Sequence, residues 1–254
     1  MILQPNTVGI YLISLSGEID SVQHSLDSLS PAEQQRAALI TPPRARRRFE
    51  LARFYLRQLL GERLDMAPSA VPISIGLNGK PELALDHARF PCHFSLSHSG
   101  GWVAIAISSE PVGVDLETRC PSTWKGIARR FFTPSEQQWL ETADDQQNAF
   151  VAAWTMKEAA VKLYGDRLLT GLRAFQIQKK GWVGGEFSAQ RALIAASTWC
   201  FPRNLWLSAT VFREQAVNNT LYSVFEKTAA EDWLINEREL NQYLMVRSCA
   251  SEQD

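Results

Sequence analysis

The segment TPSEQQ, residues 133–138, closely repeats SPAEQQ at residues 30–35, and this echo decides how the chain is divided. In each copy Ser or Thr stands at N-cap, Pro at the first helical position and Glu at the third, the pattern of a capping box at a helix start. A glycine follows some thirty residues later in both copies, in LLGERL around Gly61 and in LYGDRL around Gly165. Glycine suits the left-handed residue that ends a helix. The repeat therefore predicts two related units.

Strand-like runs follow both predicted helices, VPISIGL from Val71 and AFQIQ from Ala174. We therefore expect an α+β fold that consists of two similar halves joined by the segment RCPSTWKG. A last amphipathic helix is expected from about Ala229 to Val246, followed by a polar tail. The predicted parts are an N-terminal half, a C-terminal half and the final helix with its tail: residues 1–118, 119–228 and 229–254.

The composition is typical of a folded chain without a strong overall charge. Of 254 residues, 45% are hydrophobic and 21% charged, and the net charge is −1, so no whole-molecule field attracts nucleic acid or anionic lipid. The four cysteines include no C-x-x-C pair, which argues against a zinc site or a disulfide framework. No basic leader and no apolar run of ~20 residues is present, so we expect a cytoplasmic protein without a membrane or nucleic-acid partner. Fused halves make a monomer the expected state.

Two carboxylates stand two residues apart in PVGVDLE, residues 111–117. Side chains alternate along a strand, so Asp115 and Glu117 face the same side, with Cα atoms about 6.6 Å apart. Such carboxylates repel each other unless a cation lies between them, and Mg²⁺ prefers oxygen ligands. The alternative is an edge strand with a solvated acidic face.

The helical segment WTMKEAAVKLYG, residues 154–165, places Glu158 and Lys162 one turn apart on the same side. By themselves these two form an ordinary surface pair worth about 0.2–0.5 kcal/mol. Lys157 points about 100° away from Glu158, so we expect it to have a structural role or to lie at the edge of a phosphate site.

The segment FSLSHSGGWVAIAIS, residues 94–108, predicts two strands joined by a polar turn at residues 97–101. The hydroxyl, imidazole and N–H donors of this turn suit an anion. A Ser/His hydrolase would need G-x-S-x-G between a strand and a helix, whereas this turn leads into a strand. The alternative is that His98 merely satisfies nearby backbone groups.

Cations crowd the start of a predicted helix in PRARRRFELARFYLRQLL, residues 43–60. They oppose the helix dipole, so we expect a negative partner, and the guanidinium fork suits phosphate. The alternative is a solvated basic face. Nearby, GLNGKPEL at residues 76–83 adds a close backbone approach at Gly79 and a further cation, Lys80.

The order G-K-P, S-H-S, G-V-D-L-E and W-x-x-K-E-A-x-x-K-x-x-G resembles the surfactin-type (Sfp-type) 4′-phosphopantetheinyl transferases over most of the chain. The resemblance implies a pseudo-dimer of two α+β halves with the active site in the cleft between them. It also implies transfer of the phosphopantetheine arm of coenzyme A to a serine of an apo acyl or peptidyl carrier protein, with release of 3′,5′-ADP.

The resemblance further implies roles for individual residues. Asp115, Glu117 and Glu158 correspond to the carboxylates that hold Mg²⁺, with Mn²⁺ as an alternative, and Lys162 to the lysine that contacts the pyrophosphate. Glu158 is also the expected acceptor of the serine proton, directly or through a metal-bound water. The expected coenzyme A contacts are Arg48, Gly79, Lys80, Ser97, His98 and Lys162.

One departure concerns the segment LITPPRAR, where some relatives carry lysines. It leaves open which of Arg44, Arg46 and Arg47 assists Arg48 with the 3′-phosphate of coenzyme A.

Residues 124–132 lie where relatives meet the carrier. Arg129 and Arg130 beside Phe131 and Phe132 suit an acidic carrier helix, and burial of the phenylalanines in the core is the alternative. Two rival functions stay open: a non-catalytic coenzyme A-binding module, and a Mg²⁺-dependent nucleotide hydrolase. The sequence does not identify the carrier, which can serve fatty acid, polyketide or non-ribosomal peptide biosynthesis.

Overall fold

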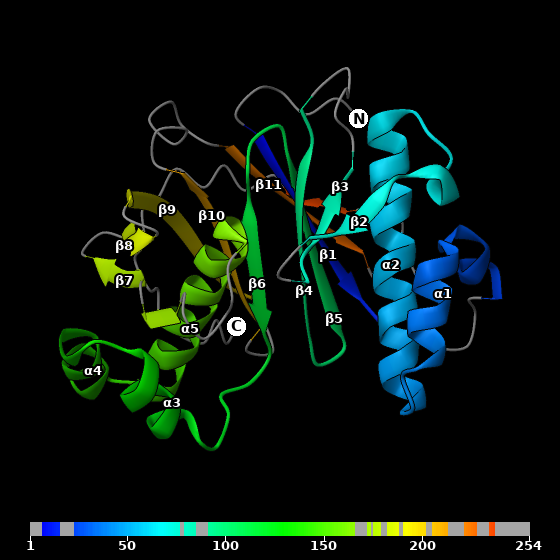
Figure 1. The fold of residues 1–254 in the computed structure, drawn as a ribbon. Helices are drawn as coiled ribbons and strands as arrows, with labels where there is room; N and C mark the ends of the chain where they lie inside the picture. Colours follow the sequence, from blue (N-terminus) through cyan, green and yellow to red (C-terminus); the bar gives the residue numbers. More distant parts are fainter. Residues whose placement is uncertain are drawn as a thin grey trace.

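The computed structural model has a mixed α+β fold with two five-stranded sheets, which confirms the predicted fold class. Figure 1 shows α1 and α2 beside the first sheet and α3, α4 and α5 beside the second. The structure describes residues 7–15, 23–76, 79–84, 91–165, 172–173, 175–178, 182–187, 190–201, 205–212, 221–227 and 234–236.

The first sheet has the strand order β12-β11-β1-β5-β4, in which β1 pairs parallel with β11 and antiparallel with β5. The second has the order β6-β10-β9-β8-β7, and its neighbouring strands pair antiparallel. The strands of the first sheet are β1 (Thr7–Ser14), β4 (His93–Ser99), β5 (Trp102–Ser108), β11 (Leu221–Lys227) and β12 (Leu234–Asn236). Those of the second are β6 (Gly113–Glu117), β7 (Phe175–Gln178), β8 (Trp182–Phe187), β9 (Gln190–Phe201) and β10 (Leu205–Phe212). A separate hairpin joins β2 (Ile73–Ile75) and β3 (Pro81–Leu83).

The helical elements are the 3-10 turns η1 (Gln23–Ser28) and η2 (Pro68–Ala70), and α1 (Pro31–Ala38), α2 (Pro43–Leu64), α3 (Trp124–Phe131), α4 (Pro134–Glu141) and α5 (Gln146–Tyr164). Of these, α2 packs on the first sheet and α5 on the second, and the shorter elements contact α2 or α5. Among the described residues, the helices lack the length and apolar character that a membrane crossing requires.

Three buried clusters give the order of the layers. The first joins α2 to one face of the first sheet, through residues such as Leu56 and Ile105. The second lies between the sheets, where Ile10 of β1 belongs to the same cluster as Leu207 of β10. The third joins α5 to the outer face of the second sheet, around Phe150. Alternation along the strands produces this arrangement, because successive side chains face opposite layers.

Both predicted capping boxes are confirmed, at the starts of α1 and α4. Gly165 ends α5 in the left-handed region (φ 73°), also as predicted. The prediction for Gly61 is wrong, since α2 continues to Leu64 and Asp65 takes the left-handed conformation instead. Gly61 serves close packing: a Cβ there would lie 2.8 Å from the carbonyl oxygen of Met66.

Each sheet contains strands from both sides of the predicted boundary near Thr118. β6 comes before it in the sequence and pairs in the second sheet, whereas β11 comes long after it and pairs in the first. The division into residues 1–118, 119–228 and 229–254 stays a prediction.

The expected C-terminal helix is wrong at residues 234–236, which form strand β12. These residues pair with β11 at the edge of the first sheet. Backbone pairing with an existing strand edge satisfies N–H and C=O groups that a short helix would leave at its ends. The remainder of the predicted helix lies outside the described residues.

Candidate active site

The two sheets meet at their edge strands, β4 and β6, through a row of serine side chains. Ser95, Ser97 and Ser99 alternate along β4 and therefore all face β6. The hydroxyl of Ser97 donates to Oδ1 of Asp115 at 2.8 Å, and that of Ser99 donates to Oε2 of Glu117 at 2.8 Å. The hydroxyl of Ser95 accepts from the backbone N–H of Val114 at 3.0 Å. These contacts fix both acidic side chains against the first sheet.

Strand β4 is longer than predicted, because it runs through Ser99 and leaves only Gly100 and Gly101 as the turn. Gly100 has φ 57°, a left-handed conformation that suits glycine. As a result Ser97 is buried toward Asp115, while His98 is exposed. The contact of Ser97 with coenzyme A stays a prediction; its hydroxyl orients a carboxylate in this structure.

Helix α5 approaches β6 unusually closely at Gly113. A Cβ at this position would overlap the carbonyl oxygen of Ala159 and would lie 2.7 Å from the backbone nitrogen of Leu163. The hydroxyl of Thr210 on β10 donates to the same Ala159 oxygen at 3.0 Å. Because glycine has no Cβ, α5 can pack this closely on β6. The close packing places Glu158 near the carboxylates of β6.

Three carboxylates converge as a consequence. Asp115, Glu117 and Glu158 each offer an oxygen, and these oxygens all lie within 4.8 Å of one another. Lys162 places its Nζ 2.6 Å from Oδ1 of Asp115. Asp115 is 2% exposed, and its Oδ2 is buried without a hydrogen-bond partner among the described residues.

The electrostatics of this cluster favour a cation. Burial, together with the charges of Asp115 and Glu117 and against the charge of Lys162, raises the pKa of Glu158 to about 8. Burial also raises the pKa of Glu117. A hard divalent cation would supply the positive charge that the cluster lacks and would use the spare oxygen of Asp115. The donor set therefore fits Mg²⁺ or Mn²⁺.

The predicted basic groups lie around the same edge of the sheets. Arg48 of α2 donates from Nη1 to the carbonyl of Gly100 at 3.3 Å, in the turn after His98. Burial, followed by the charge of Arg48, lowers the pKa of His98, which favours the neutral imidazole. Lys80 donates to the backbone carbonyl of Lys162 at 2.6 Å, and burial lowers its pKa.

The turn that presents Lys80 contains Gly79, with φ 80° and open space where a Cβ would be. Beside it lies a cavity of about 550 Å³. Sequence reasoning missed two of its lining residues. His93 stands in no recognisable motif, and Tyr164 occupies a position that the motif W-x-x-K-E-A-x-x-K-x-x-G leaves unspecified. The further lining residues are Pro81, Glu82, Leu83, Pro91, Cys92, Phe94, Pro111, Val112, Leu163 and Gly165, with Lys80.

The arginines at the start of α2 have different surroundings. Arg46 donates to the carbonyl of Ile40 at 3.0 Å, and Arg47 pairs with Glu50 at 3.3 Å. Arg44 is exposed. Further along the helix, Arg57 is buried at 1% exposure, so it does not belong to a basic surface.

Lys157 has a structural role, and the alternative of a phosphate-edge position is wrong. Its side chain is fully buried and lies 3.0 Å from Oε2 of Glu136. At the end of α3, Phe131 and the following Phe132 are buried in the core, whereas Arg129 and Arg130 are exposed. For the two phenylalanines, the alternative of burial in the core is therefore confirmed.

Comparison with known proteins identifies the family of this site. The sequence model of the 4′-phosphopantetheinyl transferase superfamily matches residues 111–216, which include β6 and α5. The 4′-phosphopantetheinyl transferase HetI of Nostoc sp. is 34% identical over 168 residues, covering 65% of this chain and 71% of that protein. The 4′-phosphopantetheinyl transferase Sfp of Bacillus subtilis is 30% identical over 153 residues, covering 59% and 66%.

A Synechocystis sp. protein, provisionally named a 4′-phosphopantetheinyl transferase, is 36% identical over 148 residues, or 57% of this chain and 60% of that protein. The chain thus spans between 60% and 71% of the length of these relatives. Because the identity reaches 34% over more than two thirds of a curated relative, and the matched region includes the three carboxylates, this chain belongs to the 4′-phosphopantetheinyl transferase superfamily.

Proposed function

We propose that this protein transfers the 4′-phosphopantetheine arm of coenzyme A to a serine of an apo carrier protein, with a divalent metal ion, and releases 3′,5′-ADP. The observation that carries the proposal is the convergence of Asp115, Glu117 and Glu158 beside Lys162, within the region matched to the family. A coenzyme A-binding module without catalysis would not need three carboxylates at one point.

The three carboxylates would hold Mg²⁺, or Mn²⁺ in its place. When bound, the metal would neutralise charge on the pyrophosphate oxygens of coenzyme A. Ser97 and Ser99 support this arrangement, because their hydroxyls hold Asp115 and Glu117 in place through one oxygen each.

Glu158 would accept the proton of the carrier serine. In the transfer, the serine oxygen forms a bond to phosphorus, the bond from phosphorus to the bridging oxygen breaks, and 3′,5′-ADP leaves. The proton passes to a carboxylate oxygen of Glu158 and then to solvent. Burial raises the pKa of Glu158 toward neutral pH, which suits a general base. Lys162 would stabilise the charge that develops on the pyrophosphate.

The phosphates of coenzyme A would contact Arg48, Lys80 and His98, which surround the turn between β4 and β5 and the end of α5. We propose Arg44 as the group that assists Arg48, because it is exposed and precedes Arg48 by four residues on the same face of α2. Arg46 and Arg47 already have partners.

The carrier would dock on α3, where Lys125, Arg129 and Arg130 are exposed and suit an acidic helix. The two halves would form the pseudo-dimer implied by the resemblance, since each contains a capped short helix followed by a long helix that packs on a sheet. We further propose a cytoplasmic monomer, because coenzyme A and apo carriers meet in that compartment.

The test is intact-mass measurement on a panel of apo acyl and peptidyl carriers after incubation with coenzyme A and Mg²⁺. The expected result is a mass gain of one phosphopantetheine arm on at least one carrier. Coenzyme A alone with the enzyme is the control: release of 3′,5′-ADP without an acceptor would indicate a hydrolase. Binding of coenzyme A without modification of any carrier would indicate a binding module.

A further inference from the structure

A fully buried ion pair lies one residue from the carboxylate cluster and has no part in the proposed reaction. Nζ of Lys157 lies 3.1 Å from Oε1 and 3.0 Å from Oε2 of Glu136. Glu136 also accepts the backbone N–H of Thr133 and that of Ile177, each at 2.7 Å. One carboxylate therefore joins the start of α4, the strand β7 and the middle of α5.

Stability alone is a weak reason for this pair. Lys157 is 0% exposed and Glu136 is 4% exposed, so both charges are removed from water. The desolvation cost of a buried pair commonly equals or exceeds its attraction, and well-packed apolar residues often stabilise a fold at least as well. A buried pair is better explained where it selects one arrangement among several.

The arrangement at issue is the rotation of α5 about its axis. On the side of β10, the hydroxyl of Thr155 lies 2.9 Å from that of Ser208, and Ala159 accepts from Thr210. On the other side, Lys157 is held by Glu136. Glu158 lies between these anchored residues. We propose that the Glu136–Lys157 pair is a positioning device that holds α5 at the rotation in which Glu158 meets Asp115 and Glu117.

The required precision is high. A side-chain end lies about 5–6 Å from a helix axis, so a rotation of about 10° moves it by about 1 Å. Functional groups need to be held within about 0.5 Å. The carboxylates of β6 also repel Glu158 and therefore favour rotation away from them. Loss of an outer partner of a metal ligand typically costs 10–100-fold in metal affinity.

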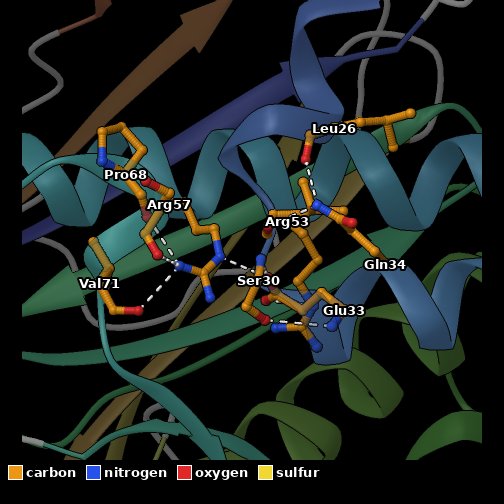
Figure 2. A network of polar contacts seen from close by, with 10 residues as sticks. Leu26, Ser30, Glu33, Gln34, Arg53, Arg57, Pro68 and Val71 are labelled. Carbon is orange, nitrogen blue, oxygen red and sulfur yellow. Dashed lines mark hydrogen bonds and ion pairs between the residues drawn. The ribbon is translucent and has the colours of Figure 1, made fainter.

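The first half of the chain contains a matched control. Glu33 has the corresponding place in the capping box of α1, and it accepts from Nε of Arg57 at 2.6 Å (Figure 2). Arg57 also donates to the carbonyls of Pro68 and Val71. In this pair Arg57 is buried and Glu33 is partly buried, and neither of its members adjoins a carboxylate of the cluster.

The experiment measures Mn²⁺ binding by electron paramagnetic resonance of the free ion, for the wild type, Glu136→Gln, Lys157→Met and the control Glu33→Gln. The inference rests on the proposed metal site, and the wild type tests that site by itself. Circular dichroism selects a temperature at which the proteins are folded. Glutamine retains the capping function at the third helical position, so Glu136→Gln removes the charge pair with little change at the helix start.

We expect Glu136→Gln and Lys157→Met to bind Mn²⁺ about 10–100-fold more weakly than the wild type, and Glu33→Gln to bind within about twofold of it. Wild-type affinity in Glu136→Gln would overturn the inference, as would an equal loss in Glu33→Gln. If Lys157→Met does not fold, Glu136→Gln decides. A wild type that binds no Mn²⁺ would overturn the metal site, and the positioning role with it.

Discussion

Replacing Gly113 with alanine tests the feature on which the whole site depends, the close approach of α5 to β6. The added Cβ would overlap the carbonyl oxygen of Ala159 and would lie 2.7 Å from the nitrogen of Leu163, whereas ordinary contact begins at 3.4 Å. The helix backbone must therefore withdraw by at least the difference, about 0.7 Å. That shift exceeds the tolerance of about 0.5 Å expected for a catalytic group.

Two consequences follow for the Gly113→Ala protein. Overpacking should cost about 1–3 kcal/mol of stability. Misplacement of a catalytic group by about 1 Å costs about 100-fold in rate, so turnover should fall by roughly that factor. Turnover is measured as carrier modification by intact mass at saturating coenzyme A, and stability by urea unfolding.

Gly61→Ala is the matched control, because a Cβ there would lie 2.8 Å from the carbonyl oxygen of Met66, and α2 carries none of the three carboxylates. This variant should lose stability to a similar degree and keep its turnover. Wild-type turnover in Gly113→Ala, or an equal loss of turnover in Gly61→Ala, would refute the link between close approach and activity.

Three further predictions concern single groups of the site. Asp115→Ala and Glu117→Ala should each nearly abolish transfer. Each should leave the metal-free fold intact, because removing one carboxylate relieves its repulsion of the others. A variant that transfers at the wild-type rate at limiting Mg²⁺ would exclude its residue as a metal ligand. Arg48→Ala should weaken coenzyme A binding about 10- to 150-fold, as expected for a lost charge-assisted hydrogen bond of roughly 1.5–3 kcal/mol. Binding of 3′-dephospho-coenzyme A should be unchanged, and calorimetry on both ligands checks this. The folded pKa of Glu158 is raised from 4.5 to about 8, so folding favours its protonated form, and metal-free stability should fall as pH rises from about 4.5 to about 8. Urea unfolding in a chelator should show that slope in the wild type and a smaller one in Glu158→Gln; identical slopes would remove Glu158 as its source.

Much of the local structure could be predicted, because the responsible interactions span only a few residues. The capping boxes at Ser30 and Thr133 and the left-handed Gly165 depend on neighbours within one helical turn. The shared face of Asp115 and Glu117 follows from strand alternation alone. Of the wrong predictions, residues 234–236 form a strand because they pair with β11, and Gly61 continues its helix because Asp65 takes the left-handed conformation that ends α2.

By itself the sequence determined which chemical groups this protein has and on which side of each element they stand. It also predicted two halves, through a repeat that local capping chemistry explains. Only the tertiary structure decided what the charged groups do. Lys157 and Lys162 belong to one helix, yet one is buried against Glu136 and the other lies beside Asp115. The physical reason is that burial and charge partners arise from contacts between residues far apart in the chain, and the function of a charge depends on both.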